Sequence, residues 1–248
     1  MARRAGAAGD GRAELALKPR FPGTRPTRFG HPNEATHNRI NYRIMEQALA
    51  YAAERYARGR LVDVGCGSKP WHAAFAPHVS EHVGVDHIDS KRAPGSVDVI
   101  AGAYEIPLED GHAETILMSA VLEHLEQPAR ALAEAHRLLA PGGHVILTAP
   151  LFWPLHEQPR DFFRYTPHGF RFLLEEAGFE VVEIVPLSGV WVTVSLQVSY
   201  ALRRYRKGPL APVADGLTVA LQWLAARWEQ VDFQPKFSWS HLVIGRKP

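Results

Sequence analysis

The chain has one cysteine, Cys66, among 248 residues. A single cysteine excludes an internal disulfide and any zinc site built from several thiolates, and it fits the reducing cytoplasm, where we expect this protein. Long apolar runs are also missing. The longest, residues 190–202, is interrupted by serine and glutamine and falls short of the roughly 20 apolar residues of a membrane-spanning helix. We therefore expect no membrane span.

Charge of one sign is equally scarce. The 28 lysines and arginines nearly balance the 26 aspartates and glutamates, which leaves a net charge of +2 with histidine neutral. A balanced surface gives no argument for a nucleic-acid partner, because such proteins carry concentrated positive charge. The expected partner is a small molecule, with a homodimer as a further expectation.

Residues 1–30 mix Gly, Pro, Ala and Arg without periodicity and predict a flexible tail before one domain over residues 31–248. Apolar spacing from 33 to 58 suits one or two amphipathic helices. Strand and helix patterns then alternate, as in a parallel sheet with helices on both faces. The predicted strands are Arg60–Val64, His82–Asp86, Val97–Ile100, Thr115–Ser119, His144–Ala149 and Phe179–Val185. The predicted helices are Lys69–Phe75, Pro128–Leu139 and Pro167–Ala177, the second ending at Pro141-Gly142-Gly143.

Residues 187–236 interrupt this alternation. They predict two helices, Gly189–Tyr205 and Val213–Trp228, before a closing strand over Ser238–Gly245. This insertion is far longer than the usual connection between two elements. We interpret it as a lid over the active site, with a dimer contact or a membrane-surface contact as alternatives. Its apolar residues predict a substrate with hydrophobic parts.

The segment LVDVGCGSKPW, Leu61–Trp71, carries the strongest functional signal. A strand ends near Asp63, and Gly65 and Gly67 allow a sharp turn that a ligand can approach closely. The third glycine of a dinucleotide fingerprint is missing because Pro70 occupies its position, and the Gly-Lys-Ser/Thr order of a P-loop is missing too. Asp86 follows about 20 residues later, where a carboxylate can accept both hydroxyls of a ribose.

With these motifs in place, the chain resembles the class I S-adenosylmethionine-dependent methyltransferases, in particular the small-molecule branch related to ubiquinone methyltransferases. The resemblance covers about half the chain and is carried by LVDVGCGS, VGVDH, IPLEDGHAETILMSAVLEHLEQPARALAEAHRLLAPGGHVILTAP and FRFLLEEAGFEVVEI. It implies an α/β fold with a Rossmann-like, seven-stranded, mostly parallel sheet and helices on both faces. The flanking patterns add an N-terminal helical lid and a helical insertion before the last strand.

The resemblance also implies a cofactor, S-adenosylmethionine, with S-adenosylhomocysteine as product. Two positions depart from the family pattern, because Gly102 stands where an acidic residue is common and Ala113-Glu114 replaces Phe-Asp. For Asp63, Asp86 and the glycines, purely structural roles remain as alternatives, and Cys66 is expected to pack. The implied cofactor-binding residues are Asp63, Gly65, Cys66 and Gly67 around methionine and ribose, Asp86 at the ribose hydroxyls, His87, Ala103 and Tyr104 beside adenine, and Ser119 facing the methyl donor.

The segment PLFWPLHEQPRDFFRYTPHGF, residues 150–170, follows the fifth strand and mixes aromatic with polar side chains, as small-molecule pockets do. His156 is the predicted general base, since the ordinary pKa of histidine lies near neutrality. The alternative is that His156 and Asp161 only hold the loop by hydrogen bonds. His124 is a rival base, and Tyr165 either bonds the substrate or packs.

No metal site is predicted, because the 13 histidines show no usual zinc spacing. A magnesium site of Asp161, His156 and Glu157 remains as an alternative. The expected function is methyl transfer from S-adenosylmethionine to a hydroxyl oxygen of a natural product or saccharide-type substrate with hydrophobic parts. Methylation of carbon or nitrogen, methylation of RNA or protein, and non-catalytic binding of S-adenosylmethionine are the alternatives.

Overall fold

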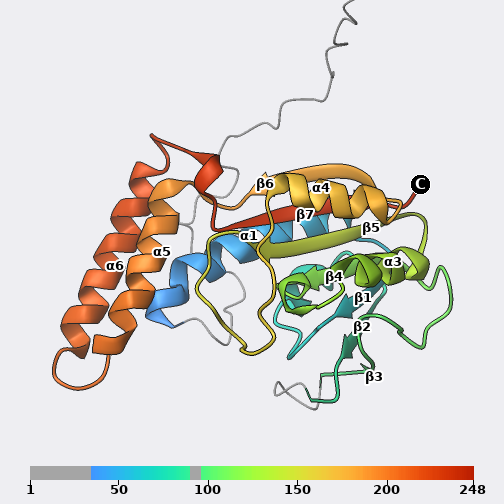
Figure 1. Cartoon of the computed structure of the whole chain (residues 1–248), viewed down its shortest axis with the longest axis horizontal. Helices are drawn as coiled ribbons and strands as arrows, with labels where there is room; N and C mark the ends of the chain where they lie inside the picture. Colours follow the sequence, from blue (N-terminus) through green and yellow to red (C-terminus); the bar gives the residue numbers. More distant parts are fainter. Residues whose placement is uncertain (1–34, 90–95) are drawn as a thin grey trace, which may run out of the picture.

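The computed structural model describes residues 35–89 and 96–248, so the predicted tail over residues 1–30 lies outside the described residues. A seven-stranded sheet forms the centre of the described part (Figure 1). Its strands are β1 (Arg60–Val64), β2 (Glu81–Asp86), β3 (Val99–Ile100), β4 (Ala113–Ser119), β5 (Leu139–Pro150), β6 (Glu180–Pro186) and β7 (Ser240–Arg246).

The strand order is β3-β2-β1-β4-β5-β7-β6. β1 to β5 pair in parallel, whereas β7 runs antiparallel to both β5 and β6. The predicted mostly parallel, Rossmann-like sheet is therefore confirmed. The order changes direction between β1 and β4, and in such sheets ligands bind at the carboxyl ends of the strands beside this point. The glycine turn after β1 lies there.

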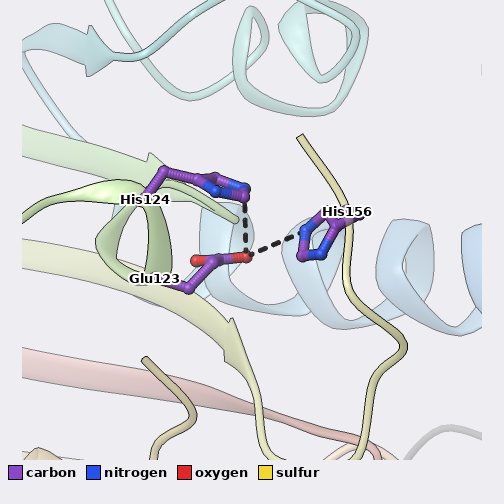
Figure 2. A group of neighbouring side chains, drawn as sticks. All are labelled: Glu123, His124 and His156. Carbon is purple, nitrogen blue, oxygen red and sulfur yellow. Dashed lines mark ion pairs between the residues drawn. The ribbon is translucent and has the colours of Figure 1, made fainter. Parts of the chain in front are cut away.

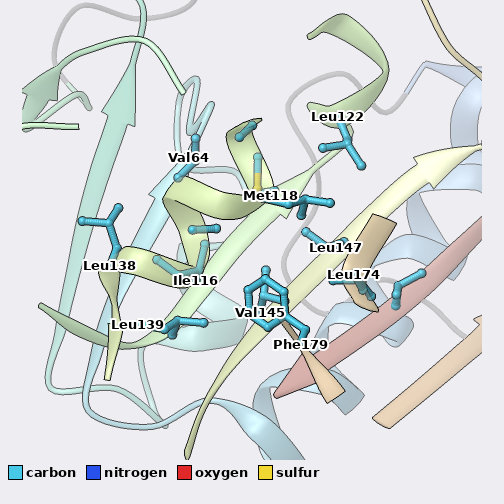
Figure 3. Packing of buried hydrophobic residues seen from close by; sticks show 14 of the residues in the cluster. Val64, Ile116, Met118, Leu122, Leu138, Leu139, Val145, Leu147, Leu174 and Phe179 are labelled. Carbon is cyan, nitrogen blue, oxygen red and sulfur yellow. The ribbon is translucent and has the colours of Figure 1, made fainter. Parts of the chain in front are cut away.

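Helices cover both faces of the sheet (Figure 1). The strands are buried on both sides, so successive residues contribute to different clusters: Leu61 belongs to the cluster that includes α1, α2, α5 and α6, and Val62 to the cluster that includes α3 and α4. Figure 3 shows the second cluster, where Ile116, Met118 and Val145 meet side chains of α3 and α4. The helices are α1 (Arg39–Tyr56), α2 (His72–Phe75), α3 (Pro128–Leu138), α4 (Pro167–Glu176), α5 (Val190–Leu202) and α6 (Ala211–Trp228).

The predicted helical insertion before the last strand is confirmed as the hairpin of α5 and α6, which projects to one side of the sheet (Figure 1). The buried carboxylate of Glu229 accepts hydrogen bonds from the backbone N–H groups of Gly189 (2.7 Å) and Val192 (2.8 Å), which fixes the start of α5. The tryptophans 191, 223 and 228 remain exposed on the hairpin. Within the described ranges, every helix is too short or too polar to cross a bilayer.

Two predicted boundaries are wrong for backbone reasons. The strand predicted to begin at His144 begins at Leu139, which pairs with Ala113, so Pro141-Gly142-Gly143 lies within β5. Gly142 takes a φ of +76°, and its N–H donates to the carbonyl of Lys247, which keeps the segment on the sheet. The helix predicted from Lys69 begins only at His72, since Lys69 has a left-handed φ of +50°.

Candidate functional site

The turn after β1 requires glycine at two positions. Gly65 and Gly67 have φ values of +71° and +52°, in the left-handed region that other residues avoid. A Cβ on Gly65 would also lie 2.5 Å from Cγ2 of Val121. The carbonyl of Val85 on β2 accepts hydrogen bonds from the N–H groups of Gly65 (2.8 Å) and Cys66 (3.2 Å). The turn is thus held against the sheet at the carboxyl ends of β1 and β2. Its two glycines expose backbone atoms without side chains there.

Asp86 binds this turn directly. Its Oδ2 accepts a hydrogen bond from the N–H of Gly67 at 2.8 Å, and its Oδ1 accepts one from the N–H of His87 at 2.7 Å. Asp86 is therefore not simply a solvated strand end. The carboxylate that the sequence assigns to a ribose lies beside the glycine turn, as that role requires.

Asp63 is 3% exposed and lies at the base of the turn. Its Oδ2 is 3.1 Å from Nε2 of His82, whose Nδ1 is 3.0 Å from Nδ1 of His72. Burial raises the pKa of Asp63, an effect that His82 opposes. Burial likewise raises the pKa of the Cys66 thiol to about 12, so the thiol stays protonated and packs.

A cavity of about 970 Å³ opens beside the turn, at the upper end of the roughly 300–1,000 Å³ typical of small-molecule sites. The cofactor predicted from sequence fits here, because Gly65 and Gly67 place no side chain in its path. Of the predicted cofactor residues, Asp63, Gly65, Cys66, Gly67 and Ser119 line this cavity, whereas Asp86, His87, Ala103 and Tyr104 lie outside its wall.

The opposite wall comes from α1, α5 and the loop after β5. Trp153 packs against Tyr200 and Trp239 with ring centroids 5.0 and 5.3 Å apart, which gives that wall an aromatic surface. Asn38 and Asn41 line the same cavity, and their Oδ1 atoms are buried without a hydrogen-bond partner. Among the described residues these two acceptors have no donor, so a ligand or water in the cavity can supply one.

Glu123 is the site residue that the sequence prediction missed. It follows β4 directly and is 1% exposed, and neither carboxylate oxygen accepts a hydrogen bond. Its Oε1 lies 3.9 Å from Nε2 of His124 and 3.9 Å from Nε2 of His156 (Figure 2). Burial raises the pKa of Glu123 to about 8. The Leu122-Glu123-His124 turn after β4 was the available signal, but the sequence alone did not show that the carboxylate is buried.

The two imidazoles are held in defined orientations. Nδ1 of His124 is 2.5 Å from the carbonyl oxygen of Arg160, and Nδ1 of His156 is 3.3 Å from that of Pro154. These contacts place the Nδ1 proton of each ring on a carbonyl and leave Nε2 toward Glu123. The two rings pack edge to face, with their centroids 4.7 Å apart. Burial lowers the pKa of His156, which keeps this imidazole neutral near pH 7.

Asp161 holds the loop around His156. Its Oδ2 accepts a hydrogen bond from the N–H of His156 at 2.9 Å, and Arg164 binds both oxygens at 2.6 and 2.8 Å. The Arg164 guanidinium holds the pKa of Asp161 well below its usual range. The holding role weighed for Asp161 is therefore present. These bonds also engage both of its oxygens, which disfavours the magnesium site of Asp161, His156 and Glu157.

Tyr165 takes the packing role of the two that the sequence left open. It is 5% exposed, its hydroxyl donates a hydrogen bond to the carbonyl of Leu122 at 2.9 Å, and its ring stacks on Phe170. It lies outside the cavity wall, which places it away from a bound substrate. Its bond to Leu122 instead supports the turn that carries Glu123.

Comparison with known proteins gives consistent results. The model of a methyltransferase domain family matches residues 36–184. A probable S-adenosylmethionine-dependent methyltransferase of Mycolicibacterium smegmatis is 29% identical over 156 residues, which cover 57% of this chain and 60% of that protein. The chain spans about half the length of the curated relatives it matches.

Solved structures show the same fold at low identity. The [4+2]-cyclase SpnF superposes with a TM-score of 0.59 at 18% identity, over 91% of this chain and 85% of its own. Phosphoethanolamine N-methyltransferase 2 of Haemonchus contortus, in complex with S-adenosyl-L-methionine, superposes with a TM-score of 0.52 at 17% identity, over 82% of this chain and 52% of its own. The family match over residues 36–184, the strand order and the glycine turn together place this chain in the methyltransferase domain family, as a class I S-adenosylmethionine-dependent methyltransferase.

Proposed function

We propose that the protein transfers the methyl group of S-adenosylmethionine to a hydroxyl oxygen of a small molecule bound in the 970 Å³ cavity. One observation carries this proposal: the same cavity is lined at one side by the Gly65–Gly67 turn and at the other by Glu123, His124 and His156. A donor at the turn and an acceptor at the imidazoles would share one enclosed space.

The reaction needs alignment more than activation, because the sulfonium already makes the methyl electrophilic. An acceptor oxygen attacks the methyl carbon, the C–S bond breaks with its electron pair on sulfur, and S-adenosylhomocysteine remains. The enzyme must hold oxygen, methyl and sulfur in line and exclude water. The hydroxyl proton goes to Nε2 of His156, the neutral imidazole nitrogen that faces the cavity cluster, with His124 as the rival base.

The wall chemistry supports an acceptor with both polar and apolar parts. The unpartnered Oδ1 atoms of Asn38 and Asn41 call for hydroxyl or amine donors, and the aromatic wall around Trp153 suits an apolar portion. A hydroxylated natural product or a saccharide with a hydrophobic aglycone meets both demands. Methylation at nitrogen or carbon is the second candidate, because an amine would satisfy the asparagines equally well.

The domain boundaries and the adenosine contacts are part of the same proposal. Residues 31–248 act as one domain, and the insertion over 187–236 acts as a lid, since Tyr200 and Arg203 line the cavity from α5 and the short turn after it. The adenosine end of the cofactor extends past the glycine turn. It reaches Asp86 there, with His87, Ala103 and Tyr104 beyond the cavity wall.

Incubation with S-adenosylmethionine labelled in its methyl group tests the proposal. The acceptor panel contains phenols, hydroxylated polycycles and glycosides, and mass spectrometry locates the transferred label. We expect label on oxygen and a loss of turnover of about 10²–10⁴-fold in His156→Ala. The matched control is His78→Ala, an exposed histidine remote from the cavity. Label on nitrogen or carbon contradicts the hydroxyl assignment. Near-normal turnover of a hydroxyl acceptor in His156→Ala shows that His156 is not the general base.

A further inference from the structure

Three ligand atoms of the kind that bind transition metals converge in the cavity wall. Oε1 of Glu123 and one ring nitrogen from each of His124 and His156 lie within 4.8 Å of one another. Figure 2 shows both imidazoles turned toward the same carboxylate oxygen. The three side chains come from the turn after β4 and the loop after β5. These two strands are parallel neighbours, so their carboxyl ends bring the side chains together.

The hydrogen bonds around the two rings turn each Nδ1 away from the space between the rings. Nδ1 of His124 faces the carbonyl of Arg160, and Nδ1 of His156 faces the carbonyl of Pro154 and, at 3.4 Å, Oδ2 of Asp161. With Nδ1 of each ring on a carbonyl, Nε2 is the nitrogen that each ring can offer to a metal. Two Nε2 atoms and one Glu123 oxygen thus face one another, and a cation can take the place of the protons that they would otherwise share.

The environment of Glu123 also favours a bound cation. Its side chain is 1% exposed and both of its oxygens lack hydrogen-bond partners, which is costly for a carboxylate. A single proton on Oε1 could bridge to only one of the two imidazoles. A divalent cation could bind all three atoms at once.

We propose that Glu123 Oε1, His124 Nε2 and His156 Nε2 bind a divalent transition-metal ion of the Zn²⁺ type, with a fourth position open to the cavity. Two imidazoles and one carboxylate form a usual ligand set for catalytic zinc, whereas Mg²⁺ prefers oxygen ligands. Tetrahedral zinc with bonds of about 2.0–2.1 Å separates its ligand atoms by about 3.4 Å. Glu123 Oε1 lies 3.9 Å from each Nε2, and all three ligand atoms lie within 4.8 Å of one another, so the side chains must move inward to bind the ion.

The surroundings of the ligands match those of metal sites. Histidine ligands usually donate their second N–H to a carbonyl or a carboxylate, which fixes the ring and raises its basicity. His124 has the Arg160 carbonyl in this role, and His156 has the Pro154 carbonyl with Asp161. The sequence predicted no metal because Glu123 and His124 lie 32 or more positions before His156, a spacing that no short motif records.

The catalytic role of an ion at this site rests on the proposed methyl transfer. With the ion bound, His156 is a ligand and cannot act as the base. The acceptor hydroxyl would instead occupy the open position, where its pKa falls and its proton passes to solvent. The ion would thereby supply Lewis-acid chemistry to the same transfer of the methyl group from sulfur to oxygen. Binding of the ion itself does not depend on the acceptor or on S-adenosylmethionine.

Metal titration of the full, untagged chain tests the site. The protein is first dialysed against a chelator, then titrated with Zn²⁺ by calorimetry and with Co²⁺ by visible absorption, in which tetrahedral sites give intense d–d bands. We expect one equivalent of each ion. Glu123→Gln and His156→Ala should each weaken binding at least about 10–100-fold, the range that even loss of an outer contact causes. His168→Ala, at an exposed position on α4, should bind as the wild type does.

The outcomes separate the two proposals. Titration with S-adenosylhomocysteine reports folding and cofactor binding in every variant, so a Glu123→Gln chain that binds this nucleoside but has lost Co²⁺ absorption supports the metal site. Absence of a stoichiometric ion in the wild type, or equal binding in Glu123→Gln, overturns the metal site and leaves the methyltransferase proposal standing. Loss of methyl transfer in the wild type with intact ion binding would overturn only the proposed function.

Discussion

The carboxylate of Asp86 accepts a hydrogen bond from the backbone N–H of Gly67 at 2.8 Å, which joins the carboxyl ends of β2 and β1. One side chain therefore supports the glycine turn, and it is the side chain that we propose binds the ribose. A cofactor that displaces or shares this bond gains a charged acceptor that is already in position.

Asp86→Asn should weaken binding of S-adenosylhomocysteine by about 10–100-fold, because a hydrogen bond to a charged group contributes about 1.5–3 kcal/mol. Isothermal titration calorimetry measures the change. Glu176→Gln, which neutralises an exposed carboxylate at the end of α4, should leave the affinity within about twofold of wild type, as surface changes do. Equal affinities in Asp86→Asn and wild type would contradict the ribose role.

Gly65→Ala should destabilise the fold and impair cofactor binding together. The left-handed φ of +71° costs an alanine about 1–2 kcal/mol, and the new Cβ would lie 2.5 Å from Cγ2 of Val121. Adding Val121→Ala should recover part of the stability, since it removes the clash but not the backbone cost. Thermal unfolding compares the three chains. No loss of stability in the single variant would show that the turn is less constrained than described.

Asp161→Asn should destabilise the chain by about 3 kcal/mol, because it leaves Arg164 without its buried partner and frees the loop around His156. The exposed pair of Arg171 and Glu175 is the control, and Glu175→Gln should cost less than about 1 kcal/mol. Chemical denaturation gives both values. Equal small costs would mean that Asp161 does not hold the loop.

Buried His241 should make the fold sensitive to acid. Burial lowers its pKa from 6.5 to about 4, so between these values the unfolded chain binds a proton that the folded chain does not. Stability is therefore unaffected above pH 6.5 and falls as the pH drops, by about 3 kcal/mol at pH 4, at about 1.4 kcal/mol per pKa unit. His241→Asn should flatten the decline between pH 6.5 and 4.5 in denaturation curves. An unchanged slope would assign the acid sensitivity to other groups.

Local sequence patterns were sufficient for the mostly parallel sheet and for the glycine turn after its first strand, whereas the cofactor contacts of that turn stay a prediction. The strand Arg60–Val64 and the turn at Gly65 and Gly67 follow from apolar runs and from glycines whose φ values other residues avoid. The predicted strand start at His144 was wrong because pairing with Ala113 extends β5 back to Leu139, and pairing depends on distant residues.

The acceptor side depends on long-range contacts that no local pattern records. His156 was singled out for its residue type, yet its orientation comes from Asp161 and from the carbonyl of Pro154. In the sequence, Glu123 looks like any carboxylate that follows a strand. In the structure, the loop after β5 covers it, and the N–H groups of Phe162 and Phe163 donate to its backbone carbonyl. Its burial is a property of the tertiary structure alone.

The most direct test of the central claim is a crystal structure of the full chain with S-adenosylhomocysteine. We expect the nucleoside to lie against Gly65 and Gly67, with its ribose hydroxyls on Asp86 and its sulfur directed into the cavity toward Glu123 and His156. A nucleoside bound elsewhere, or one whose sulfur faces away from those two side chains, would contradict it.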